Sequence, residues 1–364
     1  MFPPKVLGFR GRGPELRTLV AACAAAPRET SARRVALIGA GGSGKSMLAC
    51  ALGHRLRSSY PGGIEWFRVG GWDHQTLLDM LAIRMGIPRG TVRDRAWRLE
   101  NVRRHVAAQG GMLMVLDNHE DDRAMARFLN ALAGLPVTWV LTARRCLLSG
   151  VSIFPVVAPL VTAGHNPFPR VAGLTKLLRW NPLALDISNA LVSKRVATLE
   201  TLRGWLVAHG VDRVTTIEHE DDLPEVRLLV DWVWPRLGSG ARKVMAVLAH
   251  LQGDHADARS LAALARVPGA AAAPLARLWA WHLVQQPLDG RYALHATVRH
   301  AVNRRTLFDQ TRAVQHYLAL LERYPARLDL EQTHLFAAMD HAHATSDMRL
   351  ALRVDRLLGK LGLG

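Results

Sequence analysis

One segment of the sequence has the residue pattern of a phosphate-binding loop. Residues 39–46 read GAGGSGKS, a complete G-x-x-x-x-G-K-[ST] motif. Its glycines allow positive φ angles that turn successive backbone N–H groups inward, where they cradle phosphate oxygens. We expect Lys45 to reach the β- and γ-phosphates and the Ser46 hydroxyl to bind Mg²⁺. The motif predicts nucleoside-phosphate binding by Gly39, Ala40, Gly41, Gly42, Ser43, Gly44, Lys45, Ser46 and Met47.

A carboxylate follows about 70 residues downstream, at the end of the apolar run MLMVLD (112–117). There Asp117 is expected to hold the Mg²⁺ shell together with Ser46. The alternative is an aspartate that only caps a turn. The next residue, Asn118, is not acidic, so the adjacent carboxylate that commonly activates water is missing. We therefore expect hydrolysis to be slow.

A cation stands at the end of the next apolar run, TWVLTA (138–143). Arg144 is expected to reach the γ-phosphate and to distinguish ATP from ADP, although an ordinary surface arginine is the alternative. Together with the two residues above, it completes the predicted catalytic set of Lys45, Asp117 and Arg144. The predicted metal ligands are Ser46 and Asp117.

The elements that must position these residues alternate between strands and helices. Apolar runs predict strands at 35–39, 64–69, 112–117 and 138–143, and helical periodicity predicts helices at 14–26, 74–86, 94–108 and 122–133, with another from residue 46. The run at 112–117 shows no alternation of apolar and polar residues, which is typical of a strand in a sheet buried on both faces. This order is typical of βαβ units and a parallel sheet.

Helical patterns dominate after about residue 150. A helix is expected near Pro182, and the acidic stretch 217–222 is predicted to be a linker between domains. Residues 225–306 combine three helical segments with the runs HLVQQP and YALH around an LDGR turn, which is the pattern of a winged helix. Residues 310–364 are helical again.

We therefore predict an α/β P-loop NTPase domain with a parallel sheet, followed by an all-α subdomain, a winged-helix domain and a helical C-terminal segment. The expected boundaries are 1–30 for an N-terminal segment and linker, 31–158 for the nucleotide-binding domain, 159–222 for the helical subdomain, 223–306 for the winged helix and 307–364 for a repeat-like helical region.

Composition excludes several other classes of protein. With 49% hydrophobic and 21% charged residues over 364 positions, the chain is neither disordered nor collagen-like. Its three cysteines show no zinc spacing, no apolar run spans a bilayer, and the N-terminus lacks a signal peptide. We expect a soluble, cytoplasmic protein without a membrane partner.

The chain is strongly basic, with 47 Lys+Arg against 30 Asp+Glu and a formal charge of +17. The electrostatic field of such a positive charge attracts nucleic acid. Only six of the 47 are lysine, and the arginines are scattered along predicted helices. A compositional bias and a nucleic-acid contact through the basic surface both stay open.

The order of motifs resembles the NB-ARC class of STAND P-loop ATPases, which includes apoptosome scaffolds, plant resistance proteins and bacterial regulators. The motifs are FRGR (9–12), the P-loop, LMVLDN (113–118), LTAR (141–144), NPLAL (181–185) and the pair Leu294–His295. The resemblance covers roughly residues 8–345 and implies a short or truncated member, without room for an N-terminal effector before Phe9.

The resemblance implies roles for four further residues. Gly11 and Arg12 would lie by the adenine, and Pro182 would contact the base or ribose. His295 would bond the β-phosphate of ADP and keep the protein closed; from spacing alone it is equally a packed histidine. The chain departs from the class at Asn181, where a glycine is usual, and at Ala296, where an aspartate is usual.

The class implies an ADP/ATP switch with weak ATPase activity. ATP, with Mg²⁺, would open the protein and allow homo-oligomerisation or engagement of protein partners in signalling, transcription control or defence. The alternative is a DNA-binding AAA-type ATPase resembling origin-recognition loaders, which also place a winged helix after a P-loop domain. A nucleotide-binding subunit that no longer hydrolyses ATP is a third interpretation.

Overall fold

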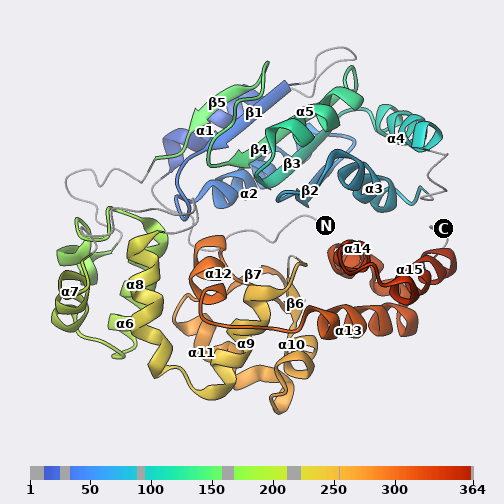
Figure 1. The fold of residues 1–364 in the computed structure, drawn as a ribbon. Helices are drawn as coiled ribbons and strands as arrows, with labels where there is room; N and C mark the ends of the chain where they lie inside the picture. The colour runs from blue at the N-terminus through green and yellow to red at the C-terminus, as the bar shows by residue number, and fades with distance from the viewer. Residues whose placement is uncertain are drawn as a thin grey trace. The chain divides into compact units, whose positions relative to one another are not determined.

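The computed structural model describes residues 12–24, 33–87, 95–157, 168–210, 223–253 and 255–361 (Figure 1). The chain divides into two compact units. One contains Met1–Gly39, Lys45–Pro155 and Val314–Gly364, and the other contains Ala40–Gly44 and Val156–Ala313. The predicted linker at 217–222 lies outside the described residues.

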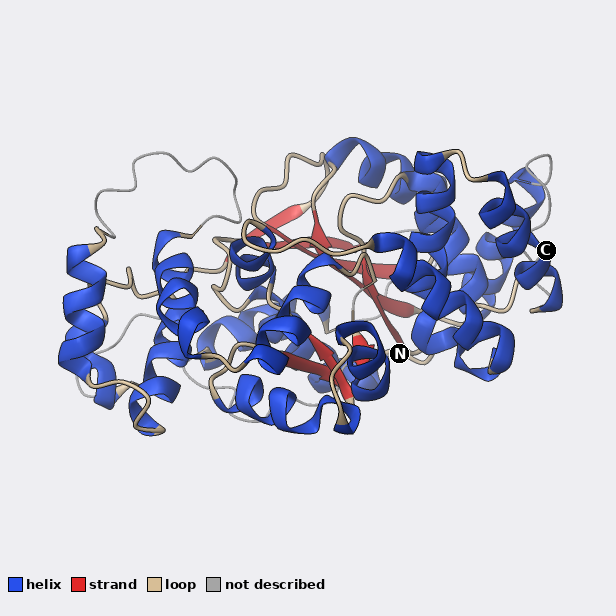
Figure 2. Ribbon diagram, turned by 60° about the horizontal axis from the view of Figure 1, so that its bottom comes forward, coloured by secondary structure: helices blue, strands red, loops and turns tan. Residues whose placement is uncertain are grey.

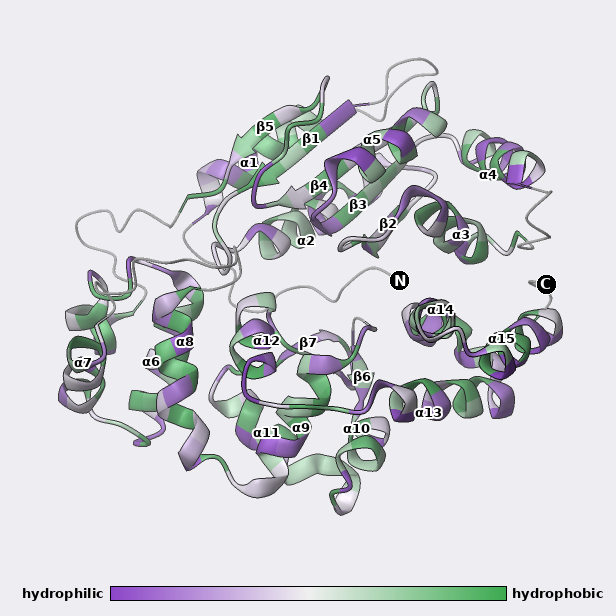
Figure 3. Cartoon of the chain, in the orientation of Figure 1, coloured by the Kyte–Doolittle hydropathy of each residue, from purple (hydrophilic) through white to green (hydrophobic). Residues whose placement is uncertain are grey.

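The first unit is built on a five-stranded parallel sheet in the order β2-β3-β4-β1-β5. Its strands are β1 (Arg33–Ile38), β2 (Ile64–Arg68), β3 (Met112–His119), β4 (Val137–Ala143) and β5 (Ser152–Pro155). Every residue of β4 is buried, and β1 changes from hydrophilic to hydrophobic along its length (Figure 3). The parallel sheet confirms the predicted fold class, and its strand order brings the carboxyl ends of β1, β3 and β4 to one edge.

Helices precede the first strand and separate β1 to β4 along the chain; Figure 2 draws helices in blue and strands in red. They are α1 (Gly13–Cys23), α2 (Lys45–Leu56), the short η1 (Arg57–Ser59), α3 (His74–Arg84), α4 (Arg95–Ala108) and α5 (Asp122–Ala131). Aspartates fix two of their starts: Asp73 accepts from two N–H groups of α3, and Asp121 does so for α5. Among the described residues no helix is long and apolar enough to cross a membrane.

The C-terminal helices join the core of this first unit. They are α13 (Gln310–Arg323), η6 (Pro325–Arg327), α14 (Leu328–Thr345) and α15 (Met348–Lys360). Leu335 and Phe336 of α14 belong to the same buried cluster as Leu81 of α3, and the Gln332 side chain donates to the Met80 carbonyl at 2.7 Å. The sequence predicted the helices but not this packing.

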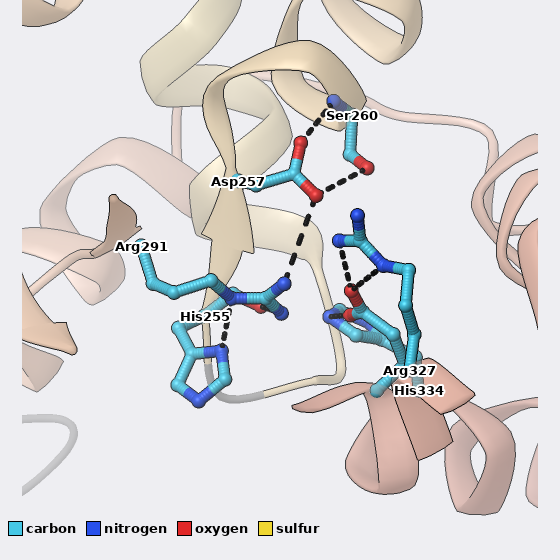
Figure 4. A network of polar contacts seen from close by, with 7 residues as sticks. His255, Asp257, Ser260, Arg291, Arg327 and His334 are labelled. Carbon is cyan, nitrogen blue, oxygen red and sulfur yellow. Dashed lines mark hydrogen bonds and ion pairs between the residues drawn. The ribbon is translucent and has the colours of Figure 1, made fainter. Parts of the chain in front are cut away.

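A buried carboxylate organises the start of α14 (Figure 4). Glu331 is 0% exposed and lies 2.6 Å from the Arg327 guanidinium and 3.9 Å from the His334 ring. The His334 ring stacks on Tyr317 of α13 with centroids 3.5 Å apart. These contacts hold α13 and α14 together.

The second unit begins with helices and continues into a winged helix. Its helical part contains η3 (Pro169–Leu174), α6 (Pro182–Ser193), α7 (Leu199–Ala208), α8 (Pro224–Val233) and η4 (Trp234–Arg236). The winged helix contains α9 (Ser239–His250), β6 (Ala256–Asp257), α10 (Ala258–Ala265), η5 (Gly269–Ala271), α11 (Ala272–Ala280), β7 (Gln285–Leu288), β8 (Arg291–Ala293) and α12 (Ala296–Asn303).

The β7–β8 hairpin is as predicted, with Gly290 in its turn at a φ of 66°. The sheet has a third, antiparallel strand, β6, which two residues are too few to reveal by pattern. Buried Arg291 secures it, because its Nε donates to His255 at 3.0 Å and its guanidinium lies 3.7 Å from Asp257 (Figure 4).

Candidate functional site

Three oxygen-bearing side chains meet at the carboxyl edge of the first unit's sheet, and we call Ser46, Asp117 and Thr142 the strand-end cluster. The Ser46 hydroxyl, in the first turn of α2, donates to Asp117 Oδ1 at 2.7 Å. The Thr142 hydroxyl, near the end of β4, donates to the same oxygen at 2.6 Å. Because β4 lies between β1 and β3, Thr142 stands beside both the P-loop strand and the strand of Asp117.

A bulge shapes the end of β3. The pairing of β3 with β4 shifts between Leu116 and His119, and Asn118 has a φ of 61°. Its backbone N–H donates to the Thr142 hydroxyl at 2.9 Å, and its side chain donates to Glu120 at 2.6 Å. Left-handed backbone costs about 1–3 kcal/mol at most residues and is common at functional sites, where bulges also concentrate.

Lys45 lies at the same edge and is half-buried. Its ammonium donates to the Gly39 carbonyl at 2.7 Å. The pKa of Lys45 is lowered to about 8, chiefly because burial disfavours its charged form and then because Arg144 is positive, while the carboxylate of Asp117 opposes both effects. Arg144 and Asp117, the other two residues predicted to be catalytic, therefore both lie within electrostatic reach of Lys45.

The loop between Gly39 and Lys45 has the backbone that its glycines predicted. Gly42 and Gly44 have φ angles of 72° and 93°. A Cβ added at Gly42 would lie 2.9 Å from Asn181 Oδ1 and 3.0 Å from Leu183 Cβ. No side chain larger than hydrogen fits there, because the start of α6 packs directly on the loop.

Asn181 and Glu225 support this loop from within the second unit, and with Gly41 we call them the loop clamp. Asn181 Nδ2 donates to the Gly41 carbonyl at 3.1 Å. Asn181 also contacts Glu225, whose pKa burial raises; the Glu225 backbone N–H, the charge of Arg179 and the Asn181 side chain oppose that shift. Both members of the pair are buried, at 6% and 3% exposure.

The remaining predicted residues occupy identifiable places. Arg12 is buried at the start of α1, where burial lowers its pKa despite Glu15 at 3.5 Å, whereas Gly11 lies outside the described residues. Met47 is 43% exposed on α2, and Pro182 is the first residue of α6. Their contacts with a nucleotide stay predictions.

His295 is the N-cap of α12. Its Nδ1 lies 2.8 Å from the Thr297 hydroxyl and accepts from the Thr297 N–H at 3.4 Å. Capping explains why a histidine suits this position, and its predicted bond to a phosphate stays a prediction.

Sequence reasoning missed two residues of the site. Thr142 was visible as a polar residue at the end of an apolar run, but its bond to Asp117 was not foreseen. Glu225 gave no signal, since a glutamate in the first turn of a helix is ordinary.

A P-loop at the carboxyl edge of a parallel sheet with this strand order, in a chain that also contains a winged helix, defines a P-loop NTPase fold, and such a fold implies nucleotide binding. A STAND protein (Signal Transduction ATPase with Numerous Domains) with a tetratricopeptide repeat sensor from Pyrococcus horikoshii aligns with 99% of this chain at a TM-score of 0.54 and 16% identity. The likeness confirms the predicted fold class.

A regulatory protein is similar to this chain in sequence. The regulatory protein AfsR of Streptomyces coelicolor is 25% identical over 221 residues, which is 57% of this chain. The chain spans 49% of the STAND structure and 22% of AfsR. No protein-family model matches the chain. The Orc1 protein of Aeropyrum pernix, solved with DNA, aligns with 83% of the chain at 16% identity, but its TM-score of 0.39 is too low to support an argument.

Proposed function

We propose that this chain is the nucleotide-dependent switch of a STAND-type regulator, which holds ADP in a closed state and opens or self-associates with ATP. The observation that carries the proposal is the strand-end cluster beside Lys45. It offers a cation for phosphate oxygens and oxygen ligands for a metal at one edge of the sheet. The regulatory role of AfsR and the signalling name of the Pyrococcus horikoshii relative support it.

The residues present fit Mg²⁺. Among the described residues no group of three His, Cys, Asp or Glu side chains could hold a metal by itself. Mg²⁺ needs no such group, since it is held by one or two protein oxygens together with phosphates and water. The hydroxyl of Ser46 and the carboxylate of Asp117 are such oxygens, 2.7 Å apart. Bound there, Mg²⁺ would neutralise phosphate charge.

Asp117→Asn tests this assignment. The amide oxygen still accepts from Ser46 and Thr142, so we expect metal-free ADP binding within about twofold of the parent. The charge that holds the metal is lost, so Mg²⁺-dependent ATP affinity or turnover should fall about 10- to 100-fold. Calorimetry with and without Mg²⁺ measures both. Equal loss of metal-free ADP binding would mean that the strand end had collapsed.

The switch itself would work by differential contacts with ADP and ATP, which shift the population of two states. Arg144 is proposed to sense the γ-phosphate, and His295 to bind the β-phosphate of ADP. A hydrogen bond to a charged acceptor contributes about 1.5–3 kcal/mol, which shifts a two-state balance by about ten- to a hundredfold. Slow hydrolysis would let the ATP state persist.

Two substitutions at His295 separate nucleotide contact from helix capping. His295→Ala removes the ring and the cap, whereas His295→Asn keeps a good N-cap for α12. If the ring binds ADP, both variants release ADP faster and form larger particles with ATP. If ADP release and particle size change only in His295→Ala, the histidine acts as a structural cap.

The nucleotide that co-purifies with the chain, and the particle mass with ADP and with ATP, test the proposal as a whole. ADP retained through purification and a mass that rises only with ATP are expected. An unchanged mass together with duplex DNA binding of steep salt dependence would favour the AAA-type alternative.

A further inference from the structure

Asn181 reaches the phosphate-binding loop from 140 residues away in the sequence. Its Nδ2 holds the carbonyl of Gly41. In a planar trans peptide the C=O and the following N–H point in opposite directions. Holding the Gly41 carbonyl on Asn181 therefore turns the Gly42 N–H to the opposite side of the loop, away from α6. A phosphate-binding loop needs its N–H groups turned toward the ligand.

The orientation of the Asn181 amide is itself fixed. Its Oδ1 accepts from the Ala184 N–H at 3.1 Å, which caps α6. Its Nδ2 carries two hydrogens, one for Gly41 and one for the buried Glu225 carboxyl. A flipped amide would place an oxygen against both of these acceptors. Three partners from the loop, α6 and α8 thus select one rotamer.

The approach to Asn181 is strained. Arg179 and Trp180 have φ angles of 49° and 56°, in the left-handed region that glycine normally occupies. Backbone bonds hold them there: the Trp180 N–H donates to Thr175 and the Asn181 N–H to Leu178, at 2.9 and 2.8 Å. Strain of this kind persists only where the surrounding structure imposes it, and it is concentrated at functional positions.

Glu225 has more hydrogen-bonding capacity than its surroundings use. Its Oε2 is buried and has no hydrogen-bond partner among the described residues. Burying a carboxyl group in this state is unfavourable. A residue kept for packing alone would be apolar at this place on α8.

We propose that Asn181 is a positioning residue for the phosphate-binding loop and that Glu225 fixes the direction of its amide. The pair acts on phosphate recognition through Gly41 and touches no reacting atom. The inference rests on the proposed function in one respect, that the ligand of the loop is a nucleotide.

The test separates loop position from fold stability. Asn181→Asp keeps the acceptor that caps α6 but replaces the Nδ2 donor by an oxygen. We expect affinity for ADP and for pyrophosphate to fall about tenfold or more. The melting temperature should also fall, because two carboxyl groups then meet in a buried place.

The double variant Asn181→Asp/Glu225→Gln removes that conflict, since the new amide can donate to the new carboxylate. The melting temperature should return toward that of the parent, while affinity for pyrophosphate stays low because Gly41 still lacks its donor. Recovery of both properties would overturn the proposal, since Asn181 would then act only through stability.

Asn189→Asp is the matched control, because it makes the same change further along α6, at a half-buried position outside the loop clamp. It should leave affinity within about twofold. If the parent protein itself binds neither ADP nor pyrophosphate, the proposed function fails. If the parent binds and Asn181→Asp binds equally well, only the positioning role fails.

Discussion

The strand-end cluster and the loop clamp support one motif in different ways. In the cluster, Asp117 pairs with Arg68 of β2 and Thr142 pairs with Leu37 of β1, and two hydroxyls share one carboxylate oxygen. The clamp stands on helix starts, is reached through left-handed residues, and contains a carboxylate oxygen without a partner in the described structure. The contrast is that neighbouring strands hold the strand-end cluster, whereas contacts from α6 and α8 hold the loop.

The largest effect is expected beside the strand-end cluster. Lys45→Ala removes the cation that the motif directs to the phosphates, so ADP and ATP affinity should fall about 100-fold or more in calorimetry. Lys360→Ala, at the exposed end of α15 in the same unit, is the control and should bind as the parent does. Unchanged affinity in Lys45→Ala would exclude this motif as the phosphate site.

Beside the loop clamp, Gly42→Ala should be compared with Gly63→Ala. Both residues have positive φ, 72° and 86°, but only a Cβ at Gly42 would meet neighbours within 4 Å. Gly63→Ala should therefore cost only strain, about 1–2 kcal/mol of unfolding free energy. Gly42→Ala should cost about 1–3 kcal/mol more and weaken ADP binding as well, because it displaces Asn181. Equal losses of stability and unchanged affinity would mean that α6 does not constrain the loop.

The smallest effect is a pH dependence. The pKa of Lys45 is lowered to about 8 in the free protein, and a bound phosphate would raise it. Affinity for ADP should therefore be full below pH 8 and fall as pH rises through 8, by no more than about tenfold per unit. Titrations from about pH 7 to 9.5 measure this slope. Any ADP binding that remains in Lys45→Arg should not depend on pH in this range, since the guanidinium stays protonated.

The same contrast explains what the sequence could predict. Strands β1, β3 and β4 follow from apolar runs, and the residues predicted to be catalytic follow from motifs at their ends, because spacing along a strand determines where a side chain lies. The loop clamp depends on contacts between Gly41, Asn181 and Glu225, which no local pattern encodes. Asn181 was visible only as a departure from its class, and β6 was too short to show a period.

The C-terminal helices have a consequence for biosynthesis. Residues 156–309 lie between the sheet and α13–α15 in the sequence, yet both pieces contribute to one buried cluster, and Gln332 of α14 donates to the Met80 carbonyl. At translation rates of about 5–20 residues per second, synthesis of these intervening residues would take roughly 8–30 s, so the helices that complete the core of the sheet would emerge that much later. During that interval the apolar residues of α3 that pack against α14 would lack this partner, whereas the residues of the winged helix are contiguous and would all be available to fold.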